Sequence, residues 1–177
     1  MIRLLRPVLF LGFLSILTGC STVSDLVVTN IPDTHQGKAK IVVNLRTQTA
    51  TLYKGKAKVA ESRISTGREG HDTPTGRFHV LRKDEAHRSS LYGDYVDRDQ
   101  RVVVANVDVR KTERPRHTHF VGASMPYFVE FTPGYGLHAG YLPGYPASHG
   151  CVRMPFWKAR QFFNGAKENT PVIIQRG

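Results

Sequence analysis

Cysteine, acidic residues and long apolar runs are all scarce in this chain. Only 2 of the 177 residues are cysteine, which excludes a small domain held together by several disulfides. The one short apolar run excludes a membrane protein with several spans, and the 16 glycines lack the period of collagen. Against 14 Asp and Glu stand 25 Lys and Arg, a formal net charge of +11. The 40% of hydrophobic residues can bury a core, and the length suits one domain.

The N-terminal residues have the pattern of a signal peptide. Arg3 and Arg6 precede an apolar core at residues 8–17, shorter than the about 20 residues that span a bilayer. The core ends in Leu17-Thr18-Gly19-Cys20, which resembles the bacterial lipobox before a lipidated cysteine. We predict a lipoprotein signal peptide at 1–19 and lipidation of Cys20. A plain secretory signal and a short buried helix are the alternatives.

This interpretation predicts an exported protein that a lipid on Cys20 anchors to a membrane. Ser21 occupies the position after the lipidated cysteine, where lipoproteins that are retained at the inner membrane usually have Asp. The resemblance therefore implies the periplasmic face of the outer membrane if the host is Gram-negative. With Cys20 acylated, Cys151 has no partner for an intramolecular disulfide. A free thiol is a liability in an oxidising compartment, which favours a chemical role for Cys151.

Alternating and β-branched runs predict a mainly-β domain at residues 40–177, after a tether at 20–39. A helix is expected at 155–163, with Pro155 at its first position and Phe156, Ala159 and Phe163 on its apolar face. The polar stretch 83–119 is expected to hold long loops around one strand. This pattern predicts a β-sandwich or partly closed barrel with one or two short helices. The expected strands are 40–45, 49–53, 58–66, 77–82, 102–109, 127–131 and 172–175.

Chemically active residues are concentrated between positions 136 and 154. A thiol needs a nearby base to become a thiolate, and the imidazole of His138 could accept the proton of Cys151 near neutral pH. Gly150 would let the backbone approach a substrate carbonyl, where N–H groups could hold an oxyanion. Arg153 could bind a carboxylate through two parallel hydrogen bonds. The segment therefore predicts nucleophilic acyl chemistry.

The segment Ser148-His149-Gly150-Cys151-Val152-Arg153-Met154, preceded by His138, resembles the catalytic motif of YkuD-type L,D-transpeptidase domains. Further blocks match this family in order: residues 41–45 with Gln48, Ser65-Thr66-Gly67, Thr73-Pro74-Thr75-Gly76-Arg77-Phe78, and Met125-Pro126-Tyr127-Phe128. The resemblance covers about residues 40–176, and it implies the β-rich fold of these domains.

The resemblance also implies the roles of the matching residues. Cys151 would be the nucleophile, and His138 the general base and later the acid. Ala139 stands where many members have Gly or Ser, so any role of this position in orienting His138 must use its backbone carbonyl. The loop 141–146 is expected to be tight, because few residues separate His138 from Cys151. The remaining roles are an oxyanion pocket shaped by Ser148, His149, Gly150 and the Cys151 N–H, and substrate contacts from Arg153 and the Tyr127 hydroxyl.

The implied reaction is a two-step acyl transfer between peptidoglycan stem peptides. Cys151 would attack the carbonyl of diaminopimelate at position 3, release D-Ala, and pass the acyl group to a second stem as a 3→3 cross-link. Water as the acceptor would give L,D-carboxypeptidase activity. A free D-amino acid as the acceptor would exchange the terminal residue, and a protein lysine as the acceptor would anchor a protein to the wall. A non-catalytic wall-binding lipoprotein is an alternative from another class. An NlpC/P60-type peptidase is disfavoured, because its cysteine precedes its histidine.

Neither a cofactor nor a metal is expected. His117 and His119, with His138 or His149, form a weak zinc pattern, because no Glu completes a recognised set and a metal would quench the thiolate. The positive charge suits carboxylate-rich stems and anionic membranes, and without a recognition helix we expect no nucleic acid. The basic cluster at 110–116 fits either a solvated loop or a substrate-facing one. The sequence leaves the oligomeric state open.

Overall fold

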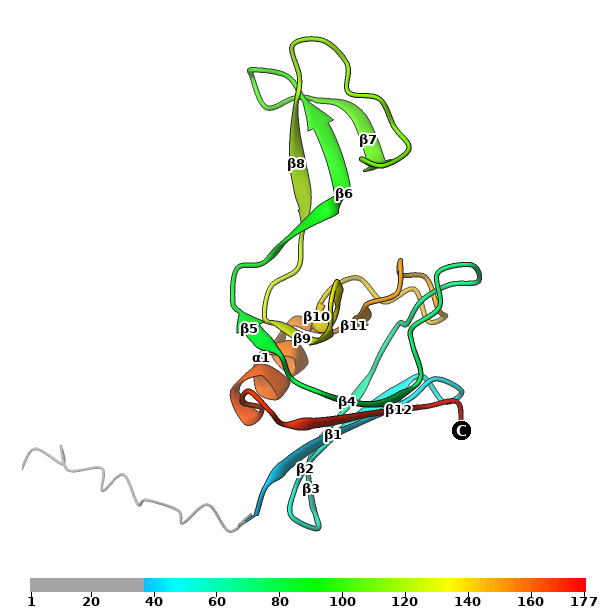
Figure 1. The fold of residues 1–177 in the computed structure, drawn as a ribbon, viewed down its shortest axis with the longest axis vertical. Coiled ribbons are helices and arrows are strands. Elements are labelled where there is room, and N and C mark those ends of the chain that lie inside the picture. The colour runs from blue at the N-terminus through cyan, green and yellow to red at the C-terminus, as the bar shows by residue number, and fades with distance from the viewer. Residues whose placement is uncertain (1–36) are drawn as a thin grey trace, which may run out of the picture. The chain divides into compact units, whose positions relative to one another are not determined.

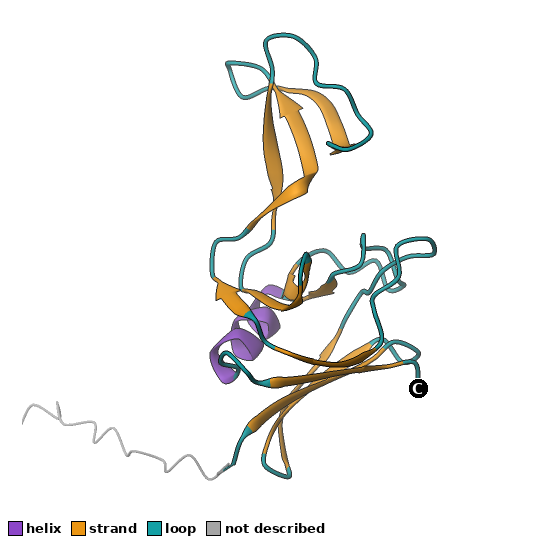
Figure 2. Ribbon diagram, in the orientation of Figure 1, coloured by secondary structure: helices purple, strands orange, loops and turns teal. Residues whose placement is uncertain are grey.

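The computed structural model of this chain describes residues 37–177. The predicted signal peptide, the lipidation site Cys20 and residues 20–36 of the predicted tether lie outside the described residues. Residues 37–177 contain twelve strands and one helix (Figure 1), and the predicted mainly-β fold is confirmed (Figure 2). Within these residues no helix is both long and apolar enough to span a membrane.

The elements agree closely with the expected runs at both ends of the domain. In chain order they are β1 (Ala39–Asn44), β2 (Thr49–Lys54), β3 (Ala57–Arg63), β4 (Gly76–His79), β5 (Arg82–Asp84), β6 (Arg88–Val96), β7 (Val102–Asp108), β8 (His119–Ser124), β9 (Phe128–Thr132), β10 (Tyr135–Ala139), β11 (Val152–Met154), α1 (Phe156–Gly165) and β12 (Pro171–Gln175).

The strands form three open sheets. The first has the order β3-β2-β1-β12-β4, and its parallel pair β1 and β12 joins the two ends of the domain. The second has the order β11-β10-β9-β5, with β10 and β11 parallel and the other pairs antiparallel. The third, β7-β6-β8, is antiparallel and is inserted between β5 and β9. The fold is therefore a sandwich of open sheets with an inserted third sheet.

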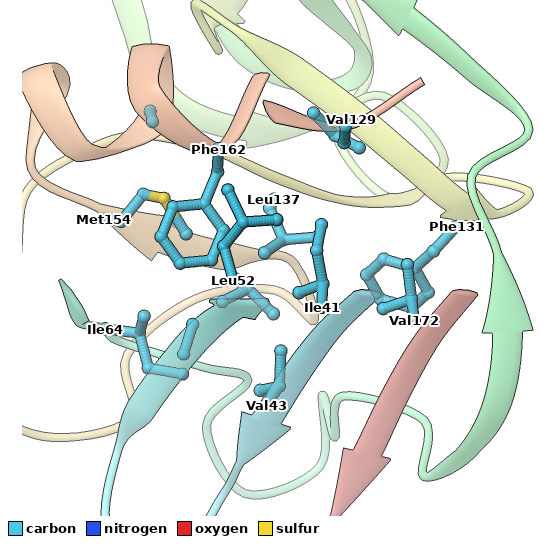
Figure 3. Packing of buried hydrophobic residues seen from close by; sticks show 14 of the residues in the cluster. Ile41, Val43, Leu52, Ile64, Val129, Phe131, Leu137, Met154, Phe162 and Val172 are labelled. Atoms are coloured by element: carbon cyan, nitrogen blue, oxygen red, sulfur yellow. The ribbon is translucent and has the colours of Figure 1, made fainter. Parts of the chain in front are cut away.

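The hydrophobic core joins the first two sheets and the helix. Alternation along β1 buries Ile41 and Val43 completely, and the same period buries Val172 and Ile174 on β12. Figure 3 shows these strands facing residues of the second sheet and the helix. The facing side chains include Val129, Phe131, Leu137, Met154 and Phe162.

The helix begins one residue later than expected, and its expected apolar face is confirmed in part. Pro155 is its N-cap, with ψ at 145°, and the helix ends at Gly165, as the Asn-Gly pair indicates. Ala159 is buried and Phe163 packs partly buried against the core, as expected, whereas Phe156 is 58% exposed. Phe162, which the expected face did not include, is also buried, so the apolar face extends to this residue.

The expectation of long loops around one strand at 83–119 is wrong. Two further strands, β6 and β8, join β7 in the third sheet. Their alternation is weak in the sequence because many side chains on both faces are partly exposed, and Tyr95, Val96 and Val107 are the buried apolar residues of this sheet. The expected strand 77–82 is also divided, since the chain leaves the first sheet after β4 and enters the second at β5.

Removing the Phe162 ring is expected to destabilise the domain strongly. Phe162 is 1% exposed in the core, so Phe162→Ala leaves a cavity, and such truncations cost about 3–5 kcal/mol. Trp157→Ala is the control, because Trp157 is 63% exposed on the same helix and its loss is expected to cost about 1 kcal/mol or less. Urea unfolding followed by circular dichroism measures both values. Equal losses would show that α1 does not dock through Phe162.

Candidate active site

The predicted catalytic residues converge where β10 and β11 run side by side. β10 carries His138, and β11 begins directly after Cys151. Their parallel pairing places His138 opposite Arg153 and Leu137 opposite Val152, which brings Cys151 to the level of Gly136. A cavity of about 460 Å³ opens here, and five predicted residues line it: His138, Ser148, His149, Cys151 and Arg153. The sequence motif therefore folds into one concave site.

The Ser65-Thr66-Gly67 block supports the loop that carries Cys151. The backbone N–H and C=O of Ser65 pair with those of Arg153, at 2.9 Å each. The carbonyl of Thr66 accepts the N–H groups of Ala147 at 2.9 Å and Ser148 at 3.0 Å. The Ser65 hydroxyl donates to the carbonyl of Tyr145 at 2.7 Å. These bonds satisfy the backbone of a loop that would otherwise lack partners.

Thr73 fixes the turn immediately before Cys151. Its hydroxyl, 4% exposed, donates to the Gly150 carbonyl at 2.7 Å and accepts the Gly67 N–H at 2.9 Å. Gly150 has φ at +115°, and a Cβ there would lie 2.5 Å from the ring of Tyr135. Only glycine fits this backbone and this approach. The Thr-Pro block is therefore part of the site's support.

Ser148 closes the same turn from its other side. Its Oγ donates to the carbonyl of Cys151 at 2.5 Å and accepts the N–H of Gly150 at 3.0 Å. The Gly150 N–H is thus already bound inside the turn. The sequence also offered the N–H of Cys151 for an oxyanion, and Ser148 Oγ does not bind this donor.

His138 is buried and held in a single tautomer. Its side chain is 5% exposed, and Nδ1 lies 2.8 Å from the carbonyl of Ala139. Because a carbonyl only accepts, Nδ1 carries the proton and Nε2 keeps its lone pair. The orienting group is the backbone carbonyl of Ala139, as the sequence required. Burial lowers the pKa of His138 to about 4, and the charge of Arg153 acts in the same direction. The imidazole is therefore neutral and able to accept a proton.

The thiol of Cys151 is half-buried and faces the turn between β9 and β10. Its Sγ donates to the Gly134 carbonyl at 3.7 Å, and the Gly136 N–H donates to Sγ. Burial raises the pKa of the Cys151 thiol. Within residues 37–177 no hydrogen bond joins Sγ to His138. At rest the pair is therefore a neutral thiol and a neutral imidazole that line one cavity, not the ion pair that the sequence suggested.

His149 links the loop before Cys151 to the third sheet. Its Nε2 accepts a hydrogen bond from Arg68 at 2.8 Å, and its ring stacks on Tyr92 of β6 with centroids 4.1 Å apart. His71 contacts the ring edge-on at 4.9 Å. Burial lowers the pKa of His149 to about 4, helped by the charge of Arg68. The residue is neutral and shapes the cavity wall through these packing contacts.

The basic cluster at 110–116 reaches the site through one residue. Arg110 donates to the Tyr92 hydroxyl at 2.8 Å and binds Asp108 at 2.7 Å. Tyr92 in turn stacks on His149. Arg110 therefore supports the cavity wall and is already paired with a carboxylate.

Arg153 projects into the cavity without a carboxylate partner among residues 37–177. Its half-buried side chain runs alongside Gly140, where a Cβ would lie 3.0 Å from the Arg153 Cγ. The ion pairs of the described chain involve other residues. A partly desolvated guanidinium with no internal counter-charge suits an anionic ligand.

Tyr127 does not line this cavity, although the sequence resemblance implied a substrate contact from its hydroxyl. Tyr127 has φ at +57°, and its ring packs against Phe156 and Phe163 of α1, with centroids 5.1 and 5.6 Å away. The next residue, Phe128, lines the cavity in its place. In the described part of the chain no three or more His, Cys, Asp or Glu side chains are grouped to hold a metal ion.

Several other residues of the cavity were not expected to belong to the site, because the tertiary structure brings them there from outside residues 136–154. They include Arg82, His87, Tyr92, Phe128 and Glu130. His87 stacks on Phe128 at 4.2 Å and its Nδ1 lies 3.0 Å from Asp84. The Arg82–Glu130 ion pair joins β5 to β9. A period-2 pattern at β9 would have shown Glu130 as a charge within an apolar strand.

Comparison with known proteins supports the family suggested by the motif. The family model for the YkuD L,D-transpeptidase catalytic domain matches residues 38–174. No curated protein sequence matches the chain significantly.

Solved structures share the fold at low sequence identity. An L,D-transpeptidase in complex with imipenem is 17% identical with a TM-score of 0.58, and the match covers 77% of this chain and 58% of that chain. For an L,D-transpeptidase from Mycobacterium smegmatis the identity is 18% and the TM-score 0.58, and the match covers 78% of this chain and 59% of that chain. For an Enterococcus faecium L,D-transpeptidase mutant the identity is 22% and the TM-score 0.58, and the match covers 79% of this chain and 50% of that chain. This chain thus spans less than two thirds of each.

Acid is expected to destabilise the domain in the pH range set by the buried His138 and the half-buried His149. His138 and His149 have a pKa of about 4 in the folded chain, below the ordinary 6.5, so between these values the unfolded chain binds more protons. The free energy of unfolding should be highest above pH 6.5 and fall as the pH drops towards 4. Urea titrations at several pH values measure this slope, and His149→Gln should reduce it. A flat profile would contradict neutral burial of these rings.

Proposed function

Because this chain belongs to the YkuD family of L,D-transpeptidase catalytic domains, we propose that it transfers acyl groups between peptidoglycan stem peptides through Cys151. The observation that carries the proposal is that Cys151 and His138 line one cavity, while the Ala139 carbonyl leaves Nε2 of His138 free to accept a proton. Acyl transfer by a thiol requires a nucleophile and a base whose ring nitrogen has a free lone pair to accept the thiol proton.

In the proposed first step, Sγ of Cys151 attacks the carbonyl carbon of diaminopimelate at position 3 of a tetrapeptide stem. His138 Nε2 takes the thiol proton as the S–C bond forms. The oxyanion accepts a hydrogen bond from the Cys151 N–H, since the Gly150 N–H is bound to Ser148. Collapse breaks the C–N bond to D-Ala, whose amine leaves with the proton from His138. The product is a thioester on Cys151.

In the second step, the side-chain amine of another stem attacks the thioester and gives its proton to His138. The C–S bond breaks, and the sulfur recovers a proton from the imidazole. The product is a 3→3 cross-link. Water would instead release a tripeptide, a free D-amino acid would exchange the terminus, and a protein lysine would anchor a protein. A non-catalytic wall-binding module would use the same cavity without a covalent adduct.

Location and anchoring are part of the proposal and rest on the sequence alone. The basic start, apolar core and Leu17-Thr18-Gly19-Cys20 motif support export with a lipid on Cys20. An anchored domain would meet stem peptides outside the cytoplasm, on the periplasmic face of the outer membrane in a Gram-negative host.

Cys151→Ala is expected to abolish turnover of tetrapeptide stems. The wild-type chain should yield 3→3 dimers, which mass spectrometry with fragmentation separates from tripeptides and exchanged termini. Cys20→Ser is the matched control, because it removes the other cysteine and should keep full activity on soluble muropeptides. Imipenem should add its mass to the Cys151 peptide in the control and not in Cys151→Ala. Turnover by Cys151→Ala would exclude the thioester, and a wild type that binds without any adduct would indicate a wall-binding module.

Arg153→Gln is expected to raise the KM for tetrapeptide stems about tenfold or more, since a hydrogen bond to a charged group contributes roughly 1.5–3 kcal/mol. Arg153→Lys should restore part of the affinity, because it keeps the charge and loses the bidentate geometry. Arg160→Gln on the exposed face of α1 is the control. Steady-state release of D-Ala gives KM and kcat. An unchanged KM in Arg153→Gln would remove Arg153 from substrate binding.

A further inference from the structure

Gly134, in the turn between β9 and β10, and Gly136, near the start of β10, supply the polar contacts of the resting thiol. The Gly134 carbonyl accepts the hydrogen bond of Sγ, and the Gly136 N–H donates to Sγ. Tyr135, between them, contacts Gly150 of the catalytic loop. The position of the sulfur therefore depends on the conformation of this turn. A shift of the turn would move the acceptor and the donor of Sγ together.

A buried carboxylate holds this turn in place. Glu130 of β9 is 8% exposed, and its Oε1 accepts the N–H of Gly134 at 2.9 Å. The same residue lies opposite Gly136 on β10 and opposite Arg82 on β5. Its Oε2 accepts a hydrogen bond from Nε of Arg82 at 2.5 Å. Glu130 thus connects the outer strand β5 to Gly134, the residue whose carbonyl faces Cys151.

The geometry leaves little room for another role of Glu130. Each carboxylate oxygen already accepts a hydrogen bond from a protein donor. The Arg82 side chain is 48% exposed, so the ion pair itself is expected to add little net stability. The negative charge also opposes ionisation of the neighbouring thiol, since it contributes to raising the pKa of Cys151. The contribution that remains for the carboxylate is to hold the Gly134 N–H, and with it the turn, in a fixed position.

We propose that Glu130, held by Arg82, is a positioning residue that fixes the β9–β10 turn so that Gly134 and Gly136 hold the Cys151 sulfur in place. The inference rests on the proposed role of Cys151 as the nucleophile. Glu130 acts through the backbone of the turn and does not itself touch the reacting atoms.

Two substitutions separate the geometry from the charge. Glu130→Gln keeps one oxygen for the Gly134 N–H, while Arg82, whose side chain is 48% exposed, can turn towards solvent. Glu130→Ala removes both the oxygen and the charge. The matched control is Glu61→Gln, because Glu61 forms an exposed ion pair with Lys58 on β3. Imipenem acylation of the full chain should be at least about tenfold slower in Glu130→Ala than in the control, since small displacements of a nucleophile carry such costs. Glu130→Gln should retain most of the rate.

The pH dependence of thiol alkylation gives a readout that a merely structural role would not move. Iodoacetamide modification of the Cys151 peptide, followed by mass spectrometry, needs no substrate. Glu130→Gln removes a negative charge near Sγ and should shift the alkylation profile to lower pH. Arg82→Met leaves the Glu130 charge uncompensated and should shift the profile to higher pH. These opposite shifts also keep the test valid if Glu130→Ala does not fold.

Three outcomes would overturn the proposal. They are acylation of folded Glu130→Ala at the control rate, equal slowing of Glu130→Gln and Glu130→Ala, and alkylation profiles that do not move in opposite directions. Failure of the proposed function has a different result, because the wild-type chain would then not be acylated, while the alkylation profiles would still report on Glu130.

Discussion

The parallel pairing of β10 with β11 is the constraint on which the site depends. It sets His138 opposite Arg153 and brings Cys151 to the level of Gly136, so three reactive side chains from two strands share one cavity. Parallel strands need a connection that crosses between them, and here the connection is the loop 140–151. The loop contains little regular structure, which is why so many hydrogen bonds from the Ser65 and Thr73 segments end on it.

The inserted third sheet contributes to the cavity without supplying reacting groups. Tyr92 of β6 stacks on His149, and Arg110, which is paired with Asp108, donates a hydrogen bond to the Tyr92 hydroxyl. The segment after β3 supports the site from outside the cavity, because Ser65 pairs with the backbone of Arg153. Residues of the second and third sheets line the cavity, and its shape depends on contacts between residues that are far apart in the sequence.

Much of the domain could be predicted from the sequence because local patterns determine it. Strong alternation predicted β1 and β2, and the Pro and Asn-Gly signals predicted the limits of α1 within two residues. The motif predicted His138 and Cys151 as site residues. The rest depends on tertiary structure. Glu130 and Tyr92 reach the cavity through strand pairing that no local pattern encodes, and Tyr127 turns to α1 because of a positive φ. The two strands of the third sheet that were not predicted, β6 and β8, carry many partly exposed side chains, so their alternation is faint.

The neutral state of the Cys151–His138 pair affects how readily the Cys151 sulfur is oxidised. Peroxides and other oxidants attack thiolates far faster than thiols, so a sulfur that stays protonated at rest is protected from conversion to sulfenic and higher acids. Burial provides this protection for Cys151, which is the free cysteine of residues 37–177. In the proposed mechanism the thiolate would form only when a substrate occupies the cavity, which would tie reactivity to occupancy and not to the redox state of the surroundings.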